Sequence, residues 1–263
     1  MRFFSFLVTT LLTLPLSAQP VSIQEIPVQT ESFTTDHLGN LYTIEKNHIV
    51  KYNKNGEKLY FFSTNKYGNV TGLDVSNPYK ILVFFSDFST LLFLDNTLSL
   101  NGEPINMQQQ GMEMTALAAS SYQNGIWLYD ALQFRLIRLN ENLSVTVNTP
   151  NLVQTTGINL QPTFMQEYNN LLFVNNPESG ILVFDIFGAY IKTIPILQIK
   201  KFQPIENEIL YVKENRFYRY HLKTLDIISE PLEKNSIDCR LEKQRKYLLT
   251  TQSVLLFNTS DNP

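Results

Sequence analysis

Apolar runs with the composition of buried β-strands return six times along the chain. The intervals between them are 40, 45, 45, 38 and 38 residues, because the runs begin at Leu41, Ile81, Ile126, Leu171, Ile209 and Tyr247. Turn-forming sequences separate the runs from neighbouring strand patterns, as in Asp36-His37-Leu38-Gly39-Asn40 and Asn53-Lys54-Asn55-Gly56. A period of this length indicates a repeat architecture in which each unit is one supersecondary motif.

Each unit reads as four strands joined by tight turns. In the first unit, strands are expected over residues 32–36, 41–45, 48–53 and 58–63. Four-stranded units of about 40 to 50 residues are typical of propeller blades. The sequence therefore predicts an all-β fold, a six-bladed β-propeller of four-stranded antiparallel blades. Five closed blades with additional terminal strands are the structural alternative.

The last unit is one strand short, and the N-terminal region supplies a candidate for it. Residues 236–258 account for three strands, and few residues follow them. The segment of about residues 21–28 alternates apolar and polar side chains and has no partner before the first blade begins. We expect this segment to become the outer strand of the last blade and so to remove an exposed sheet edge.

The first residues have the pattern of a secretory signal peptide. Arg2 precedes an apolar stretch over residues 3–16, and Ser17-Ala18 provides the small residue expected before a cleavage site. The apolar stretch is shorter than the roughly 20 residues of a membrane-spanning helix, although an uncleaved anchor is the alternative interpretation. We predict a signal peptide at residues 1–18, a single domain over 19–263, and no transmembrane segment in the mature chain.

Composition argues against binding to nucleic acid or an anionic membrane surface, and it excludes an intrachain disulfide. The net charge of −3 and the sequence pI of about 5.7 give no overall attraction to nucleic acid or to an anionic membrane surface. Cys239 is the one cysteine, so no intrachain disulfide can form. It lies in an alternating segment, which predicts a buried thiol.

Two segments resemble a known propeller family. Asp36-His37-Leu38-Gly39-Asn40-Leu41-Tyr42 resembles the D-x-x-G-N-[LIV]-Y signature of NHL-type and related six-bladed propellers, and Gly125–Asp130 resembles the equivalent part of another blade. The other four units depart from this pattern, so the resemblance implies architecture and not an enzymatic subfamily. As a whole the chain is similar to exported propellers of bacterial cell envelopes. That similarity implies a location in the periplasm or on the periplasmic or outer face of the outer membrane.

Motifs of the common catalytic centres do not occur. The three histidines, His37, His48 and His221, are not spaced to place two metal ligands on one face, and no nucleophile elbow or phosphate-binding loop is present. We therefore assign no catalytic and no cofactor-binding residue from the sequence. Serine chemistry and nucleotide hydrolysis have no support in these residues.

Carboxylates at the ends of the predicted inner strands suggest one possible metal site. Some propellers related by fold, such as lactonases, hold a divalent cation in the central channel with ligands from several blades. The residues at comparable positions here are Asp74, Glu167, Glu206 and Asp238. Acidic residues also cap turns at strand ends, which is the competing interpretation.

A second ring of polar residues follows the turn between the second and third strands of each blade. One acidic or amide residue falls there per blade, namely Glu45, Asp87, Asp130, Asn176, Glu214 and Gln252. The preference of these residue types for turns explains the ring without a function. The functional hypothesis is a rim that binds a partner, with nearby aromatic anchors at Phe88, Phe134 and Tyr129.

Two classes of function remain open from the sequence. The first is a non-catalytic, monomeric interaction module that binds another envelope protein or a membrane-protein complex, as an accessory subunit of an outer-membrane or secretion assembly. The alternative is a metal-dependent hydrolase or lactonase-like enzyme with a divalent cation in the channel, or a carbohydrate-binding propeller. The fold alone does not choose between these classes.

Overall fold

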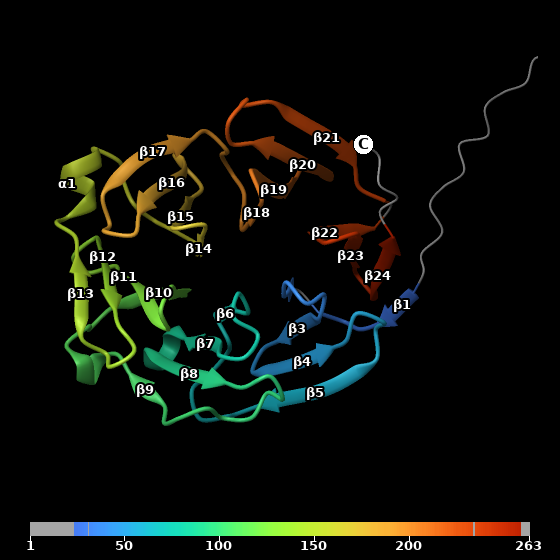
Figure 1. Cartoon of the computed structure of the whole chain (residues 1–263), viewed down its shortest axis with the longest axis horizontal. Helices are drawn as coiled ribbons and strands as arrows, with labels where there is room; N and C mark the ends of the chain where they lie inside the picture. Colours follow the sequence, from blue (N-terminus) through green and yellow to red (C-terminus); the bar gives the residue numbers. More distant parts are fainter. Residues whose placement is uncertain (1–23, 31, 234, 259–263) are drawn as a thin grey trace, which may run out of the picture.

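Six antiparallel sheets stand around a common axis as the blades of a propeller (Figure 1). The structure is a computed structural model that describes residues 24–30, 32–233 and 235–258. Within these residues each sheet has four strands, which confirms the predicted six-bladed fold. The predicted signal peptide at residues 1–18 lies outside the described residues.

The first three blades follow one another along the chain. Blade 1 comprises β2 (Ser32–Thr35), β3 (Leu41–Glu45), β4 (His48–Tyr52) and β5 (Lys58–Ser63). Blade 2 comprises β6 (Gly72–Asp74), β7 (Ile81–Phe85), β8 (Thr90–Leu94) and β9 (Ile105–Asn106), with the short helices η1 (Ser86–Phe88) and η2 (Gln108–Gln110). Blade 3 comprises β10 (Thr115–Ser121), β11 (Gly125–Asp130), β12 (Arg135–Leu139) and β13 (Val145–Asn148), followed by α1 (Leu152–Thr156).

The remaining three blades include the one that closes the ring. Blade 4 comprises β14 (Phe164–Tyr168), β15 (Leu171–Asn176), β16 (Gly180–Asp185) and β17 (Tyr190–Ile194). Blade 5 comprises β18 (Gln203–Ile205), β19 (Glu208–Lys213), β20 (Arg216–His221) and β21 (Ile227–Pro231). Blade 6 comprises β22 (Ser236–Glu242), β23 (Arg245–Thr250), β24 (Ser253–Asn258) and β1 (Gln24–Pro27).

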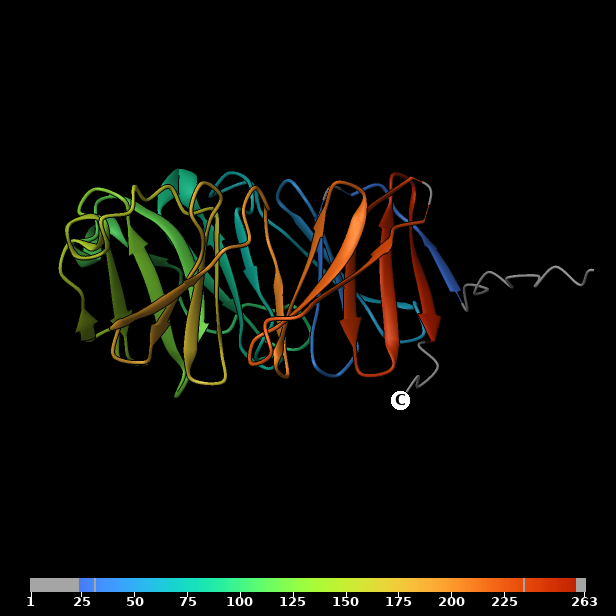
Figure 2. The ribbon, with the colours of Figure 1, turned by 90° about the horizontal axis from the view of Figure 1, so that it is seen from above.

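The strands run across the thickness of a disc, so the turns collect on its two faces (Figure 2). The turns between second and third strands form one face, which we call the rim face. The turns between first and second strands, and between third and fourth strands, form the opposite face. Because each blade repeats the same hairpins, equivalent turns in different blades lie on the same face.

Each blade buries both of its faces against its neighbours. In β7, Ile81, Val83 and Phe85 pack toward blade 1, whereas Leu82 and Phe84 pack toward blade 3. All five side chains are at most 1% exposed. A strand that is buried on both faces does not alternate apolar and polar residues, because both sets of side chains face the core. This explains why the second strands read as continuous apolar runs in the sequence.

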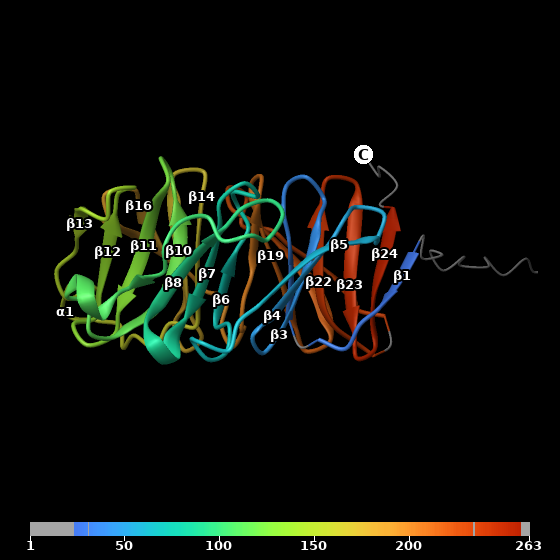
Figure 3. The ribbon, with the colours of Figure 1, turned by 90° about the horizontal axis from the view of Figure 1, so that it is seen from below.

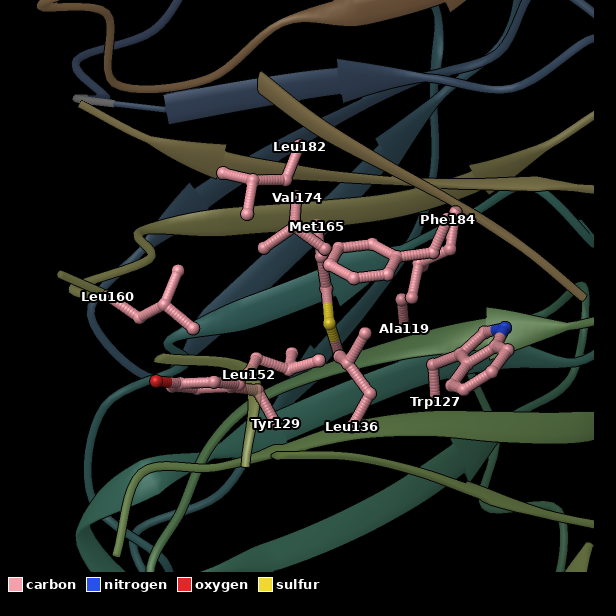
Figure 4. Close-up of a cluster of buried hydrophobic side chains, with 11 residues drawn as sticks. Ala119, Trp127, Tyr129, Leu136, Leu152, Leu160, Met165, Val174, Leu182 and Phe184 are labelled. Atoms are coloured by element: carbon pink, nitrogen blue, oxygen red, sulfur yellow. The ribbon is translucent and has the colours of Figure 1, made fainter. Parts of the chain in front are cut away.

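One apolar cluster fills each interface between adjacent blades in the described residues. The cluster between blades 3 and 4 joins Trp127 of β11 to Phe184 of β16 (Figure 4). Leu152 of α1 packs into the same cluster, which fixes the connection that follows blade 3. Five further clusters occupy the other five interfaces, so the hydrophobic core is a ring of six parts.

Strand β1 closes the ring as the sequence predicts. It pairs antiparallel with β24, with Ile26 opposite Val254 and Glu25 opposite Leu255 (Figure 3). Ile26 is 4% exposed and belongs to the apolar cluster between blades 6 and 1. The part of the predicted strand at residues 21–23 lies outside the described residues.

The outer strands vary most between blades. The connection over residues 141–161 contains both β13 and α1. Asn151 caps α1, because its Oδ1 accepts a hydrogen bond from the Gln154 amide at 3.0 Å. The outer strand of blade 2 is short, since β9 has two residues. Cys239 is buried, as predicted.

The turns between third and fourth strands share one structure in four of the blades. In four of them an Asx oxygen accepts hydrogen bonds from the amides two and four residues later, at Asn53, Asp95, Asn140 and Asp185. The residue three positions later has positive φ in each case, namely Gly56, Leu98, Leu143 and Gly188. Asx residues favour such turns because the side chain replaces a backbone acceptor.

Truncating the closing strand tests its contribution to stability. We expect Ile26→Ala to lower the free energy of unfolding by roughly 2–4 kcal/mol, since it leaves a cavity in the cluster between blades 6 and 1. The matched control is Glu25→Ala, which removes an exposed side chain of the same strand and should change stability by less than about 0.5 kcal/mol. Urea unfolding of both variants measures the difference. Equal effects would show that β1 does not seal the ring.

Candidate functional site

The motif at residues 36–42 builds the turn between the first two strands of blade 1. Asp36 is 1% exposed, and its Oδ1 accepts hydrogen bonds from the amides of Leu38 and Asn40, both at 2.9 Å. Its Oδ2 accepts from Asn40 Nδ2 at 2.7 Å and from the Tyr42 hydroxyl at 2.8 Å. The carboxylate is therefore occupied within its own blade.

The six predicted rim residues all lie at turns between second and third strands, on the rim face. They differ in what their side chains do. Glu45, Asp87, Glu214 and Gln252 are exposed, whereas Asp130 and Asn176 are 4% and 1% exposed. The ring predicted from the sequence therefore divides into four exposed residues and two buried ones.

Hydrogen bonds hold Asp130 within its own turn and join Asn176 to the connection that precedes blade 4. Asp130 accepts from the Leu132 amide at 3.0 Å and forms an ion pair with Arg135 at 3.0 Å. The Oδ1 of Asn176 accepts from the Gln161 amide at 2.7 Å, and its Nδ2 donates to Ser179 Oγ at 2.6 Å. Neither side chain is available to a partner on the rim face.

Of the three predicted aromatic anchors, Phe88 of η1 is the exposed one, at 55%. Phe134 has a positive φ of 52° and packs against the cluster between blades 3 and 4. Tyr129 is 2% exposed, and burial together with the Asp130 charge raises the pKa of its hydroxyl to about 12. Phe134 and Tyr129 are therefore packing residues.

The structure adds two exposed apolar residues beside Phe88. Met114, just before β10, is 56% exposed, and Leu132, in the turn after β11, is 53% exposed. The Ala131 amide donates to the Met114 carbonyl at 2.9 Å, which brings these two segments together, and η1 contacts β10. We call Phe88, Met114 and Leu132 the apolar rim patch. Met114 and Leu132 were not predicted from the sequence, because an apolar residue beside a strand has the pattern of a core residue.

Two hollows lie at opposite faces of the disc. The rim face has one of about 370 Å³ between blades 6 and 1, lined by Gln29, Thr30, Ile44, Glu45, Lys46 and Thr251. The opposite face has one of about 320 Å³ over blades 2 to 4, whose lining includes Lys80, Ser120, Tyr122 and Glu167. Both are large enough for a small polar molecule. The second is lined by the ammonium group of Lys80 and the carboxylate of Glu167.

The four carboxylates considered as metal ligands have separate environments. Glu167 accepts from Ser121 Oγ at 2.5 Å, from the Tyr122 amide at 3.0 Å and from Trp127 Nε1 at 2.6 Å, all in the neighbouring blade 3. Asp74 accepts from the amides of Ser76 and Ser120.

The other two carboxylates also lie apart. Asp238 Oδ2 lies 2.7 Å from Lys201 Nζ, and Glu206 is exposed in the turn after β18. No group of three or more His, Cys, Asp or Glu side chains with metal-binding geometry occurs among the residues that the structure describes. The structure does not bring the four candidates together.

A buried polar cluster lies instead around the propeller axis. Thr35 of β2, Gln203 of β18, and Arg240 and Glu242 of β22 form it, and we call it the axis cluster. Thr35 Oγ1 donates to Glu242 Oε1 at 3.2 Å and accepts from Arg240 Nε at 3.1 Å. Gln203 Nε2 donates to Glu242 Oε1 at 3.1 Å. The cluster therefore joins the inner strands of blades 5, 6 and 1.

Lys201 connects the same three blades from the loop before β18. Its Nζ donates to the Phe33 carbonyl at 3.1 Å and to Ser32 Oγ at 3.3 Å in blade 1, and it pairs with Asp238 in blade 6. In the sequence Lys201 follows Lys200, and no local pattern marks its contacts with the other two blades.

Burial changes the ionisation of the axis cluster. It raises the pKa of Glu242 to about 7, although the Arg240 charge and the Thr35 hydrogen bond oppose that shift. Burial lowers the pKa of Arg240, against the charges of Glu242, Asp238 and Asp74. Glu242 thus exchanges its proton near neutral pH, which is unusual for a carboxyl group.

No protein-family model and no curated protein matches the sequence. Solved structures do resemble the fold. Virginiamycin B lyase from Staphylococcus aureus aligns with a TM-score of 0.57 at 12% identity, over 86% of this chain and 79% of that one. BBS1N in its complex with ARL6DN aligns with a TM-score of 0.56 at 11% identity, over 90% and 78% of the two chains.

A third solved structure is a bacterial surface protein. PorZ, a surface component of the type-IX secretion system of Porphyromonas gingivalis, aligns with a TM-score of 0.50 at 8% identity, over 92% of this chain and 38% of that one. Likeness at these identities establishes the fold alone. The protein is a six-bladed β-propeller related in architecture to these structures.

The raised pKa of Glu242 predicts a pH-dependent stability. The folded state holds this proton more tightly than the unfolded chain, so the Glu242 contribution to the free energy of unfolding falls as pH rises from about 5 to about 8. Relative to Glu242→Gln, wild type should lose on the order of 1–3 kcal/mol over this range. Denaturant unfolding at several pH values measures it, with Glu214→Gln as the exposed control. A constant difference between wild type and Glu242→Gln would contradict the assignment.

Proposed function

We propose that the protein is an exported interaction module whose rim face binds another protein. The observation that carries the proposal is the apolar rim patch of Phe88, Met114 and Leu132, three large apolar side chains that are each more than half exposed. Protein interfaces combine such apolar anchors with a polar surround. Asp87 and Glu113, both exposed, lie in the same segments as the patch.

The chemistry of the patch indicates the kind of partner. Two acidic side chains flank three apolar ones, so a complementary surface offers an apolar pocket bordered by Lys or Arg. The N-terminal sequence pattern supports export of the protein, and a partner would then be an envelope protein or a membrane-protein complex. Within the described residues no helix has the length and apolarity to cross a membrane.

Protein binding is known among proteins of similar fold. BBS1N was solved in a complex with ARL6DN, and PorZ is a surface component of a secretion system. These are properties of those proteins. They support a role as an accessory subunit of an outer-membrane or secretion assembly only by analogy of fold.

Site-specific photo-crosslinking tests the rim face directly. A photoreactive residue at position 88 or 132 should crosslink to the same single protein in the native cell envelope. The matched control is position 187, because Phe187 is 73% exposed in a turn on the opposite face. Phe88→Ser should reduce the co-purified partner by about tenfold, as expected for an interface anchor, whereas Phe187→Ser should not. Equal crosslinking from positions 88 and 187, or none from either, would overturn the proposal.

Removal of the N-terminal segment tests export separately. A chain that lacks residues 1–18 should remain in the cytoplasm, because it has lost the apolar stretch that the secretion machinery recognises. The full-length chain should be recovered outside the cytoplasm with Gln19 as its first residue. Cell fractionation and N-terminal mass spectrometry measure both outcomes. Identical locations for the two chains would show that this segment does not direct export.

A further inference from the structure

The hollow of about 320 Å³ on the opposite face has walls from three blades. The turn between β6 and β7 contributes Asn77 and Lys80, the hairpin of β10 and β11 contributes residues 120–125, and β14 contributes Glu167. The volume lies at the lower end of the range of roughly 300–1,000 Å³ that is typical of small-molecule sites. The hollow shares no residue with the apolar rim patch, so it is a separate candidate site.

Carboxylates beside the hollow hold its walls together. Glu167 accepts its three hydrogen bonds from blade 3. Asp74, at the end of β6, accepts a hydrogen bond from the Ser120 amide at 2.8 Å and so joins blade 2 to blade 3. Both carboxylates are therefore engaged within the protein, and their charge disfavours an anionic ligand.

Arg138 supports the wall that the hairpin of β10 and β11 forms. It lies in β12 and is 4% exposed. Its Nε donates to Ser121 Oγ and its Nη2 donates to the Tyr122 carbonyl, both at 2.7 Å. The guanidinium also stacks on the Tyr122 ring, 3.8 Å from its centroid. Support of this kind holds a binding surface in one geometry.

Lys80 supplies hydrogen-bond donors to the hollow. Its Nζ lies 4.4 Å from the centroid of the Phe93 ring and 3.5 Å from the Asn124 carbonyl oxygen. It belongs to none of the ion pairs that the described residues form. Because an ammonium group has three N–H donors, at least two of those of Lys80 are open to a ligand.

The hairpin of β10 and β11 adds polar groups on the other wall. Ser120 Oγ is buried and has no hydrogen-bond partner among the described residues. Rotation about its Cα–Cβ bond can turn a serine hydroxyl toward a ligand without moving the backbone. Gln123 and Asn124 are exposed at the turn itself, with positive φ of 53° and 58°. Their side-chain amides offer both donors and acceptors.

We propose that this hollow binds a neutral saccharide unit. A sugar hydroxyl both donates and accepts hydrogen bonds, so it matches the Lys80 ammonium as well as the amides of Gln123 and Asn124. A neutral ligand avoids the repulsion that Glu167 and Asp74 exert on an anion. A cationic ligand would meet Lys80 while both nearby carboxylates are already engaged. This site goes beyond the proposed binding of a partner on the rim face and does not depend on it.

Titration with methyl glycosides tests the proposal on the wild-type mature chain. Backbone amide signals of residues 121–125 in nitrogen-15 NMR spectra should shift saturably with the methyl glycoside of glucose, galactose or mannose. A ligand of this size should bind with a Kd on the order of 1 mM. The matching uronide, which adds one carboxylate, should bind more weakly. No saturable shift with any of these glycosides, or tighter binding of the uronide, would overturn the proposal.

Two pairs of variants separate binding from stability. Ser120→Ala should raise the Kd about fivefold without lowering the unfolding temperature, because it removes a hydroxyl that the fold leaves unpaired. Its matched control is Ser236→Ala, which removes another buried, unpaired hydroxyl in blade 6 and should leave the Kd unchanged. Lys80→Met should raise the Kd about tenfold. Lys58→Met, which removes an ammonium over the Phe61 ring on the outer strand of blade 1, should not.

The same Kd in wild type, Ser120→Ala and Lys80→Met would show that the glycoside binds elsewhere and would overturn the site. Failure of the rim-face crosslinking would leave this result unaffected, because the two sites share no residue.

Discussion

Burial of both faces of every blade is the constraint on which the rest of the structure depends. The second strands β7, β11, β15 and β23 each send alternate side chains to the two neighbouring blades. A blade that stood alone would expose both of its apolar faces to water. Closure of the ring is therefore a condition for stability, and it depends on β1 because blade 6 takes only three strands from the C-terminal end of the chain.

The polar residues considered for the site lie in the turns and on the inner strands. Turn residues such as Asp36 and Asp130 use their oxygens within their own blade. Inner-strand residues instead meet across blades, as Glu167 does with Trp127 and as Glu242 does with Thr35. A partner can bind only side chains that are not already engaged in a turn or packed between blades. The exposed side chains of the apolar rim patch meet this condition.

The candidate site could be predicted only in part. The position of the rim residues follows from the repeat, because equivalent turns lie on one face once the number of blades is known. Whether these side chains are free to bind a partner does not follow from the repeat. An Asp in a turn has the same sequence pattern when it is exposed, as Asp87 is, and when it is paired, as Asp130 is with Arg135. Met114 and Leu132 were missed for the related reason that an apolar residue carries no sign of its exposure.

By itself the sequence determined the period of the strands, the number of blades and the strand that closes the ring. These features depend on local properties, namely the alternation of side chains along a strand and the chemistry of tight turns. Only the tertiary structure decided which polar groups meet. Arg240 and Thr35 are 205 residues apart and touch because the ring brings the last blade beside the first. Such contacts depend on how neighbouring blades pack, which no local pattern records.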